Sequence, residues 1–352
     1  MKTITVHASK TYEIRIGSGV LSGLPALLRE LGAPETVFVV SDDTVFALYG
    51  RQVTSALAAE GFRTACFVFP HGEEQKSLKT YEALIRELVR AHVTRSDVLV
   101  ALGGGTVGDL AGFAAATFER GIRYVQIPTT LLAAVDSSVG GKTGVDLPEG
   151  KNLVGAIYQP AAVLTDIDTF RTLPKEQYLS GAAETLKYGM IGSAALFDRW
   201  SDVPIREIYE ESAAEAVSMK RDLVELDEKD EGPRMLLNFG HTFGHAAEAC
   251  SGYRLPHGYA VAMGMAAVTR AAAKLGYCSA ETPEALEYTL KRYELPTEIP
   301  FRMEELLPHL LRDKKIRGEV LNLVIPERIG RCVVHPVELR QVGDWLEAGG
   351  VR

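Results

Sequence analysis

A short apolar run that passes directly into a glycine turn most strongly limits what this chain can fold into. Residues 98–102, Val-Leu-Val-Ala-Leu, are followed by Gly103, Gly104, Gly105, Gly108 and Asp109. Such an uninterrupted apolar run is typical of a strand buried on both faces in a parallel sheet. Glycines between a strand and a helix allow backbone N–H groups to cradle a phosphate. The segment predicts a nucleotide-binding α/β sheet, with a simple packing turn as the alternative.

The same alternation of short apolar strands and helical patterns runs through the first half of the chain. Strands are expected at residues 4–6, 12–16, 36–40, 63–69, 97–102 and 122–127, with helices around 45–60 and 77–91. From Pro174 onward helices are expected at 175–200, 205–228, 235–250, 259–275, 283–293 and 303–312, and strands only at 320–325 and 331–334. The pattern predicts an α/β domain over residues 1–170 and an α-rich domain over residues 171–352. Because active sites often lie between domains, both should supply functional residues.

Composition and charge exclude several classes of partner. The formal net charge of −8 would repel nucleic acid and anionic membrane surfaces. The longest apolar runs, at 110–116 and 260–268, are far shorter than the roughly 20 residues that span a bilayer, and the first residues lack a signal-peptide core. Four scattered cysteines fit a reducing compartment. We therefore expect a soluble, cytoplasmic protein.

Polar residues at the ends of other strands extend the nucleotide prediction. The common dinucleotide-binding fold places an acid about 20 residues after the glycine turn, but here that region holds Arg123, Tyr124 and Gln126. An earlier strand does end in an acid, Asp42, which is suited to the ribose hydroxyls. The loop 71–76, which includes Glu73 and Lys76, follows the next strand. Because carboxyl ends of parallel strands meet at one edge, this loop should lie beside Asp42.

Three of the eight histidines lie in one short stretch. His241 and His245 are four residues apart, so a helix would present both on one face, and His257 follows a turn that contains glycine and proline. A catalytic zinc ion usually takes three protein ligands and keeps one position open. Glu184, on a predicted helix, would complete a Glu/His/His set with His241 and His257. The alternative is that these are ordinary polar residues on a helix.

Cations and amides recur beside glycines and small residues in an otherwise acidic chain. The loop between residues 128 and 152 ends in Gly150, Lys151 and Asn152, and further cations follow at Lys187, Lys220, Arg234, Lys314 and Lys315. Glycines permit close backbone approach, and ammonium and guanidinium groups are strong ligands for anions. The pattern favours a small substrate with several negative charges, whereas a solvated loop is the alternative for residues 128–152.

Together these motifs resemble those of the 3-dehydroquinate synthases, within the sugar phosphate cyclase group. The resemblance covers essentially the whole chain and rests on residues 103–117, 128–132, 136–142, 150–152, 184–187 and 238–245. It implies a lyase of the shikimate pathway, which serves aromatic amino-acid biosynthesis. The implied reaction converts 3-deoxy-D-arabino-heptulosonate 7-phosphate to 3-dehydroquinate and phosphate. The implied steps are transient oxidation by bound NAD, elimination of phosphate, re-reduction and an intramolecular aldol reaction.

The resemblance also implies roles for individual residues. Zinc or cobalt would be held by Glu184, His241 and His257. Substrate contacts would come from Asp136, Lys142, Lys151, Asn152, Lys187, Lys220, Arg234, Asn238, His245 and one or both of Lys314 and Lys315. NAD contacts would come from Asp42, Thr44, Glu73, Lys76, Gly103, Gly104, Gly105, Asp109, Thr129, Thr130, Leu132, Asp136, Lys142, Lys151, Thr169 and Thr172. Arg120 would reach the site of a neighbouring subunit, which would make a homodimer functional.

A finer hypothesis divides the substrate's two anionic groups between the predicted ligands. Lys142 and Arg234 would hold the carboxylate, whereas the phosphate would be held by Asn238, His245 and the late lysines.

Two positions depart from the pattern of this family. The family usually has an acid two residues after the third metal ligand, whereas this chain has Tyr259 after His257. Loss of an outer carboxylate that orients a ligand histidine typically costs about 10- to 100-fold in metal affinity or activity. Thr44 occupies a nucleotide-loop position often held by asparagine, and its hydroxyl can still bond a ribose.

Three other functions are compatible with parts of the sequence. A sibling cyclase would act on another sugar phosphate, but Arg234 with Lys220 favours a substrate that bears a carboxylate. A metal-dependent NAD polyol dehydrogenase would release NADH, and the many anion-binding lysines argue against it. A regulatory nucleotide-binding protein without catalysis would not need a metal triad beside those lysines.

Overall fold

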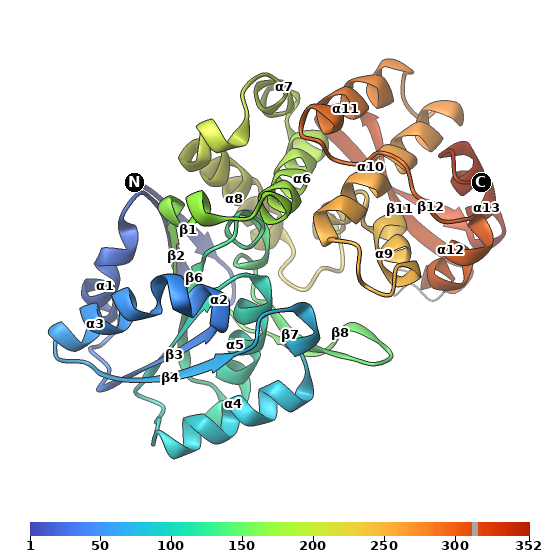
Figure 1. The fold of residues 1–352 in the computed structure, drawn as a ribbon. Helices are drawn as coiled ribbons and strands as arrows, with labels where there is room; N and C mark the ends of the chain where they lie inside the picture. The colour runs from blue at the N-terminus through green and yellow to red at the C-terminus, as the bar shows by residue number, and fades with distance from the viewer. Residues whose placement is uncertain (312–315) are drawn as a thin grey trace. The chain divides into compact units, whose positions relative to one another are not determined.

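The computed structural model describes residues 1–311 and 316–352, and these divide into two compact units (Figure 1). The N-terminal unit comprises Met1–Leu173 and Glu210–Lys229, and the C-terminal unit comprises Pro174–Tyr209 and Asp230–Arg352. The first crossing between the units lies close to the domain boundary predicted near residue 170. The return of residues 210–229 to the N-terminal unit was not predicted.

A seven-stranded sheet forms the centre of the N-terminal unit, in the order β1-β2-β9-β6-β5-β3-β4. Neighbouring strands are parallel, apart from the antiparallel pair β1 and β2. The strands are β1 Lys2–His7, β2 Thr11–Gly17, β3 Thr36–Asp42, β4 Arg63–Phe69, β5 Val98–Gly103, β6 Arg123–Pro128 and β9 Ala162–Asp166. The predicted parallel-rich sheet with an opening strand pair is therefore confirmed.

Alternate residues of the central strands enter two cores on opposite faces of this sheet. Phe38 and Val40 of β3 belong to one core, whereas Val37 and Val39 belong to the other. Helices cover both faces, which explains why the strands read as uninterrupted apolar runs. The covering helices are α4 Leu78–Arg90 and α5 Gly105–Thr117 on the first core, and α1 Leu24–Glu30 and α3 Arg51–Ala59 on the second. A short α2, Asp43–Val45, follows β3.

A hairpin replaces the glycine-rich loop expected between residues 128 and 152. β7 Lys142–Leu147 pairs antiparallel with β8 Gly150–Ile157. A Cβ atom on Gly155 would lie 2.1 Å from the Thr143 carbonyl oxygen, so only glycine lets these strands approach so closely. The glycines that suggested a ligand loop therefore also serve strand pairing.

Helix α8, Tyr209–Leu226, ties residues 210–229 to the N-terminal unit. The Glu225 carboxylate accepts a hydrogen bond of 2.6 Å from the backbone N–H of His7, and Glu228 accepts one of 2.6 Å from the Ser9 hydroxyl. These contacts join residues more than 200 positions apart in the sequence, which local periodicity cannot reveal.

The C-terminal unit is built mainly of helices, with a small antiparallel sheet among its described residues. Its helices are α6 Lys175–Gly192, α7 Ala194–Asp202, α9 His241–Cys250, α10 His257–Lys274, α11 Glu281–Arg292, α12 Met303–Leu310 and α13 Val342–Ala348. The sheet contains β10 Ile316–Arg317, β11 Val320–Arg328 and β12 Arg331–Glu338. The α-rich second half and its late strand pair are thus confirmed.

Two predicted helices of this unit are interrupted. The helix expected over residues 175–200 breaks at Ser193, whose extended backbone separates α6 from α7. The helix expected over residues 235–250 begins only at His241, because Gly240 adopts a left-handed conformation with φ of 77°. A Cβ atom on Gly264 of α10 would lie 1.9 Å from the Gly240 carbonyl oxygen. Glycines therefore allow α9 and α10 to pack in close contact.

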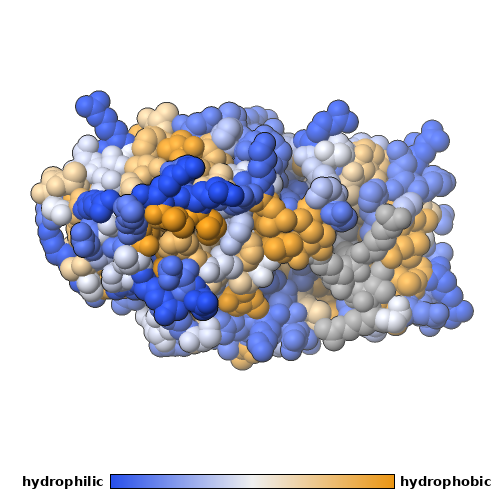
Figure 2. All heavy atoms as spheres, turned by 90° about the horizontal axis from the view of Figure 1, so that it is seen from below, coloured by the Kyte–Doolittle hydropathy of each residue, from blue (hydrophilic) through white to orange (hydrophobic). Residues whose placement is uncertain are grey.

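In the view of Figure 2, apolar side chains form several groups that are separated by hydrophilic ones. Exposed apolar side chains include Leu78 and Val89 of α4. Scattered apolar residues of this kind are normal on folded domains.

Within residues 1–311 and 316–352, no helix has both the length and the apolar character needed to cross a membrane.

Candidate active site

The glycine turn lies between β5 and α5, as the sequence predicts. Gly103 ends β5, and a Cβ atom there would lie 2.5 Å from a Val107 methyl carbon. At Gly104 a Cβ atom would lie 3.2 Å from the Thr130 methyl carbon. No described side chain caps the first turn of α5, so its leading N–H groups are suited to an anion.

Parallel pairing brings several predicted nucleotide contacts to one edge of the sheet. β3, β5 and β6 are neighbours and end at Asp42, Gly103 and Pro128. The Thr129 N–H donates to the Gly103 carbonyl at 2.9 Å, which places the residues after β6 beside the glycine turn. The Asp42 carboxylate accepts a 2.8 Å hydrogen bond from the Val45 N–H and so caps α2. Burial raises the pKa of Asp42, against the opposing effect of this hydrogen bond.

Buried Lys76 lies at the centre of a polar cluster beside α5. Its ammonium nitrogen is 2.6 Å from the Asp109 carboxylate and donates to the Asn152 side-chain oxygen at 2.6 Å. Glu73 lies 3.9 Å from this nitrogen and 3.8 Å from that of Lys151. Burial alone would lower the pKa of Lys76, but Asp109 and Glu73 outweigh it and raise the pKa. The cluster thus joins five of the predicted cofactor and substrate residues.

A second ion pair of this unit depends on α8. Lys220, only 5% exposed, donates to the Asp136 carbonyl at 2.6 Å and is paired with its carboxylate. Asp136 lies in a π-helical turn, Ala133–Ser137, which follows Leu132. Both members of the pair were predicted to contact ligands, and the structure brings them together.

The other predicted site residues of the N-terminal unit lie apart from these clusters. Lys142 begins β7 with an exposed side chain, and Arg120 is exposed in a short 3₁₀ turn after α5. The Thr44 hydroxyl donates to Asp43 at 3.4 Å. In the 3₁₀ turn after β9, buried Thr169 donates to the Asp166 carbonyl, and the Thr172 hydroxyl lies 2.5 Å from that of Tyr49.

Three helices of the C-terminal unit bring the predicted metal ligands together. Glu184 of α6 is fully buried, and its Oε1 lies 3.0 Å from His257 Nε2 and 3.3 Å from His241 Nε2. The three ligand atoms lie within 4.8 Å of one another. One carboxylate oxygen and two imidazole nitrogens at this spacing form a donor set suited to zinc or a similar divalent metal.

Backbone and side-chain partners orient these donors. His241 Nδ1 lies 3.0 Å from the Phe239 carbonyl oxygen, which favours the tautomer that donates there and leaves the Nε2 lone pair toward Glu184. Glu184 Oε2 is 2.5 Å from the Lys187 ammonium nitrogen, and both side chains are at most 1% exposed. This ion pair holds the carboxylate with Oε1 turned toward the histidines.

The same contacts shift the ionisation of the cluster. Burial would raise the pKa of Glu184, but Lys187 and His241 outweigh it and hold the pKa well below its usual range. Burial lowers the pKa of His241, which keeps that imidazole neutral. For His257 burial also lowers the pKa, yet hydrogen bonds to Glu184 and Glu248 raise it to about 10. The deprotonated carboxylate of Glu184 and the neutral imidazole of His241 are the forms that bind metals, whereas His257 would release its proton on binding one.

The other predicted residues of this unit vary in exposure. Arg234 is 1% exposed in the 3₁₀ turn Pro233–Asn238, and Asn238 donates to the Met235 carbonyl at 3.1 Å. The His245 side chain is 47% exposed, one turn after His241 on α9. Lys314 and Lys315 lie outside the described residues.

Sequence reasoning missed Glu248, a second carboxylate beside the metal set. It is 2% exposed on α9, and its Oε2 lies 3.5 Å from His257 Nδ1 and 4.0 Å from His245 Nε2. The sequence feature that could have indicated Glu248 is its position three residues after His245, which places both side chains on one helix face. The acid that the family usually has at position 259 is thus not the sole carboxylate able to face His257.

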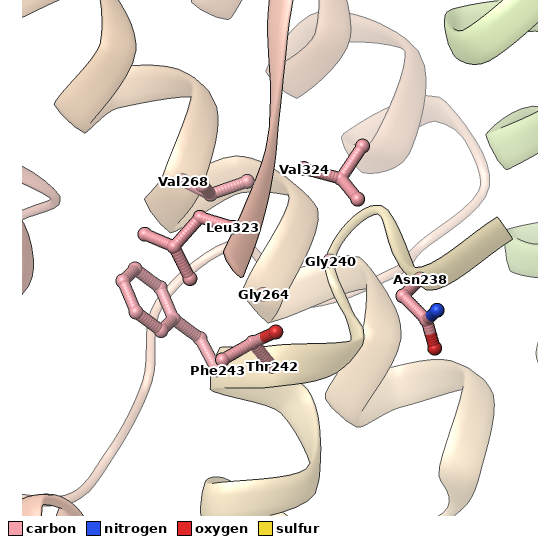
Figure 3. Close-up of a pocket in the computed structure, with 8 residues that line it drawn as sticks. All are labelled: Asn238, Gly240, Thr242, Phe243, Gly264, Val268, Leu323 and Val324. Atoms are coloured by element: carbon pink, nitrogen blue, oxygen red, sulfur yellow. The ribbon is translucent and has the colours of Figure 1, made fainter. Parts of the chain in front are cut away.

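A small hollow adjoins this region (Figure 3), with a volume of about 10 Å³. It is lined mainly by glycine and apolar side chains, with Asn238 and Thr242 as polar members. A volume of this size holds about one water molecule. The hollow is therefore too small and too apolar to be the anion-binding site.

Solved structures with the same fold were found over nearly the whole chain. A 2-deoxy-scyllo-inosose synthase complexed with carbaglucose-6-phosphate, NAD⁺ and Co²⁺ superposes with a TM-score of 0.89 at 24% identity, covering 98% of this chain and 99% of that one. A 2-epi-5-epi-valiolone synthase from Streptomyces hygroscopicus, with NAD⁺ and Zn²⁺ bound, gives 0.88 at 26% identity and covers 99% of both chains. The chain thus has the fold of sugar phosphate cyclases.

Sequence comparisons are more specific. Family models described as 3-dehydroquinate synthase N-terminal and C-terminal match residues 66–180 and 181–316. A 3-dehydroquinate synthase from Geobacter metallireducens is 44% identical, covering 100% of this chain and 99% of the relative. One from Streptococcus suis is 42% identical, covering 98% and 99%. With its fold, its Glu/His/His set and these full-length similarities, the chain belongs to the 3-dehydroquinate synthase family.

Proposed function

We propose that this chain converts 3-deoxy-D-arabino-heptulosonate 7-phosphate to 3-dehydroquinate and phosphate. The observation that carries the proposal is the convergence of Glu184, His241 and His257 in a chain 44% identical to a 3-dehydroquinate synthase over its full length. The reaction releases phosphate and closes a carbocycle without net oxidation, so a nicotinamide cofactor is needed only in catalytic amount. The step belongs to the shikimate pathway of aromatic amino-acid biosynthesis.

The residues of the C-terminal unit fit a resident zinc or cobalt ion. Glu184, His241 and His257 would hold it, because they offer one oxygen and two nitrogens within 4.8 Å of one another. A metal bound there supplies a Lewis acid that lowers the pKa of a coordinated hydroxyl group. Lys187 keeps Glu184 oriented, and the Phe239 carbonyl keeps His241 in the ligand tautomer.

The residues of the N-terminal unit fit NAD. The glycine turn offers uncapped N–H groups for the pyrophosphate, and Asp42 lies at the same sheet edge for the ribose. Further contacts are proposed for Thr44, Glu73, Lys76, Asp109, Thr129, Thr130, Leu132, Asp136, Lys142, Lys151, Thr169 and Thr172. Bound NAD supplies hydride transfer that is reversed within one turnover.

The buried and exposed cations of the C-terminal unit support the substrate assignment. Arg234, as a buried guanidinium, is suited to bidentate binding of the substrate carboxylate. Asn238 and half-exposed His245 would bind the phosphate together with Lys314 and Lys315. Lys142, Lys151, Asn152, Lys187 and Lys220 complete the proposed substrate contacts.

We also propose a cytoplasmic homodimer. The support for the location is that Cys66, Cys250, Cys278 and Cys332 are free thiols, as expected in a reducing compartment. The proposed role of Arg120, to reach a neighbouring subunit's site, is supported by its exposed side chain. Arg120→Ala mixed with a Glu184→Gln partner should regain part of the lost activity if sites are shared between subunits.

One assay tests the proposed reaction. Zinc-loaded protein is given the heptulosonate phosphate with NAD at catalytic concentration, and inorganic phosphate and nicotinamide absorbance are recorded together. Phosphate in large excess over NAD, without lasting NADH, is the expected result. Accumulation of NADH without phosphate would instead indicate a polyol dehydrogenase and contradict the proposal.

A sibling cyclase is the second candidate, because two such enzymes have TM-scores of 0.89 and 0.88 with this chain. Glucose 6-phosphate and sedoheptulose 7-phosphate lack the carboxylate proposed to bind Arg234. In the same assay these substrates should release little phosphate. Arg234→Ala should raise KM sharply for the heptulosonate, and an unchanged KM would remove the assigned role of Arg234.

A further inference from the structure

Glu248 is a buried carboxylate whose described neighbours include two histidines of the candidate site. It lies on α9 with 2% exposure, whereas its Oε2 is 3.5 Å from His257 Nδ1 and 4.0 Å from His245 Nε2. Burying a carboxylate is costly unless hydrogen bonds or charges compensate it. The contacts of Glu248 must therefore offset the free-energy cost of burying its carboxylate.

The imidazole of His257 lies between two carboxylates, one at each ring nitrogen. Nε2 is 3.0 Å from Glu184 Oε1, and Nδ1 is 3.5 Å from Glu248 Oε2. A histidine that ligates through one nitrogen usually donates its other N–H to a carboxylate or carbonyl, which sets the tautomer and the ring orientation. His241 has such a partner in the Phe239 carbonyl, and Glu248 stands in the equivalent position for His257.

We propose that Glu248 is the positioning residue that holds His257 as the third metal ligand. This inference rests on the proposed metal site and adds a role for a carboxylate outside the ligand set. Tyr259, at the position where the family usually has an acid, has no carboxylate to face His257, whereas Glu248 does.

His245 is the competing explanation for Glu248. The pair is three residues apart on α9 at 4.0 Å, and the His245 side chain is 47% exposed. A role through His245 would affect substrate binding, whereas a role through His257 affects metal affinity before any substrate is present. The two roles are therefore separated by measuring metal binding alone.

The test compares metal affinity in the parent chain, Glu248→Gln and Glu248→Met. Zinc affinity is measured by competition with a chelator, and the visible absorption of the Co²⁺ form reports ligand geometry. Glutamine retains a neutral oxygen acceptor, so we expect a loss of about 10-fold, whereas methionine offers only a weak sulfur acceptor and should lose about 100-fold. The Co²⁺ spectrum should change most in Glu248→Met.

Stability of the metal-free protein separates positioning from packing. Methionine fills a similar volume without a buried charge, so Glu248→Met should be at least as stable as Glu248→Gln without metal. The matched control is Glu287→Gln, which removes a carboxylate 2.8 Å from Arg270 on another helix of this unit and should leave zinc affinity within about twofold. His245→Gln should likewise leave zinc affinity nearly unchanged.

Each outcome decides one point. If the folded parent chain binds no zinc or cobalt, the proposed metal site itself is wrong. If the parent binds metal but both Glu248 variants match it within about twofold, only the positioning role is overturned. If His245→Gln reproduces the loss seen in Glu248→Met, Glu248 acts through His245 and the inference is also overturned.

Discussion

Each unit holds one buried charged side chain at the centre of a polar cluster, and the two central charges have opposite sign. In the N-terminal unit the Lys76 ammonium lies among carboxylates, with Asp109 at 2.6 Å and Glu73 at 3.9 Å. In the C-terminal unit the Glu184 carboxylate lies among an ammonium and two imidazoles, at 2.5 to 3.3 Å. Burial acts against the charged form in both places, yet the pKa of Lys76 rises and that of Glu184 falls.

The difference indicates which cluster is completed by the protein and which by a ligand. Lys76 has carboxylate and amide oxygens of its own unit around it, so its positive charge is balanced internally. Glu184 is paired through Oε2 with Lys187, while its Oε1 lies 3.0 and 3.3 Å from two imidazole nitrogens. One oxygen and two nitrogens at this spacing form a donor set that suits a metal cation. The first cluster therefore supports a binding surface, whereas the second is itself the proposed reactive centre.

The largest effect is expected from Glu184→Gln. The variant loses a charged member of the proposed metal set and leaves the buried Lys187 ammonium without its carboxylate. Metal affinity should fall by more than the roughly 100-fold that is typical when a residue hydrogen-bonded to a ligand is replaced. In the absence of metal, the free energy of unfolding should fall by about 3–5 kcal/mol. Zinc content after dialysis, phosphate release and urea unfolding measure these changes. Retention of full zinc content would contradict the comparison.

Asp109→Asn should destabilise the N-terminal unit by about 3 kcal/mol, because Lys76 remains buried without its nearest carboxylate. NAD binding should weaken, whereas zinc affinity should not change. The paired substitution Lys76→Met with Asp109→Leu removes both charges and should cost less than Asp109→Asn alone. A double variant that is less stable than the single would show that the cluster is not an internally balanced pair.

Gly264→Ala tests how the second cluster is held. Its Cβ atom would lie 1.9 Å from the Gly240 carbonyl oxygen, so α9 and α10 must separate, and we expect a loss of about 2–3 kcal/mol. Gly343→Ala in α13 is the control, because a Cβ atom there meets only Met303 sulfur at an ordinary 3.6 Å. Thermal unfolding of both variants measures the effect, and equal stability would argue against close packing of α9 and α10.

The smallest effect concerns an exposed pair of the N-terminal unit. His71 Nδ1 lies 2.8 Å from the Asp43 carboxylate; this contact raises the pKa of His71 and lowers that of Asp43. Because the pKa of His71 is higher in the folded state, the pair contributes stability below the unfolded-state pKa, near 6.5. That contribution is lost as the pH rises through the folded-state pKa of His71. Because the pKa of Asp43 is lower in the folded state, its contribution to stability is present above the unfolded-state pKa, about 3.9. That contribution is lost as the pH falls through the folded-state pKa of Asp43.

The stability difference between the parent chain and His71→Gln should therefore be larger at pH 5.5 than at pH 8. Thermal unfolding of both chains at the two pH values measures this difference. Surface pairs of this kind contribute little and are screened by salt. The difference should accordingly shrink in high salt, and a pH-independent difference would show that the pair contributes through packing.

Much of the fold follows from local patterns in the sequence. The apolar run before Gly103 predicts a buried parallel strand, and the spacing of His241 and His245 predicts one helix face. Both are found, because strand and helix periodicities depend on neighbouring residues alone. The β7–β8 hairpin was missed, since the glycines that permit its close strand pairing, such as Gly155, equally suit a ligand loop.

The candidate site was predictable to a similar degree. Glu184, His241 and His257 were chosen by their donor types and by family resemblance, and the structure brings their ligand atoms together. Glu248 was not chosen, because a single acid on a helix carries no sign of what it will face. Likewise, nothing local indicates that α8 returns Lys220 to Asp136.

The sequence by itself determined the order and type of most elements, the glycine turn and the set of groups able to bind a metal. Only the tertiary structure decided which atoms meet. The separation of α9 from α10 is set by a glycine contact at Gly264, and this packing places Glu248 of α9 beside Nδ1 of His257. Glu184 reaches the other nitrogen of His257 from α6. Such contacts depend on residues distant in the chain, so no local periodicity encodes them.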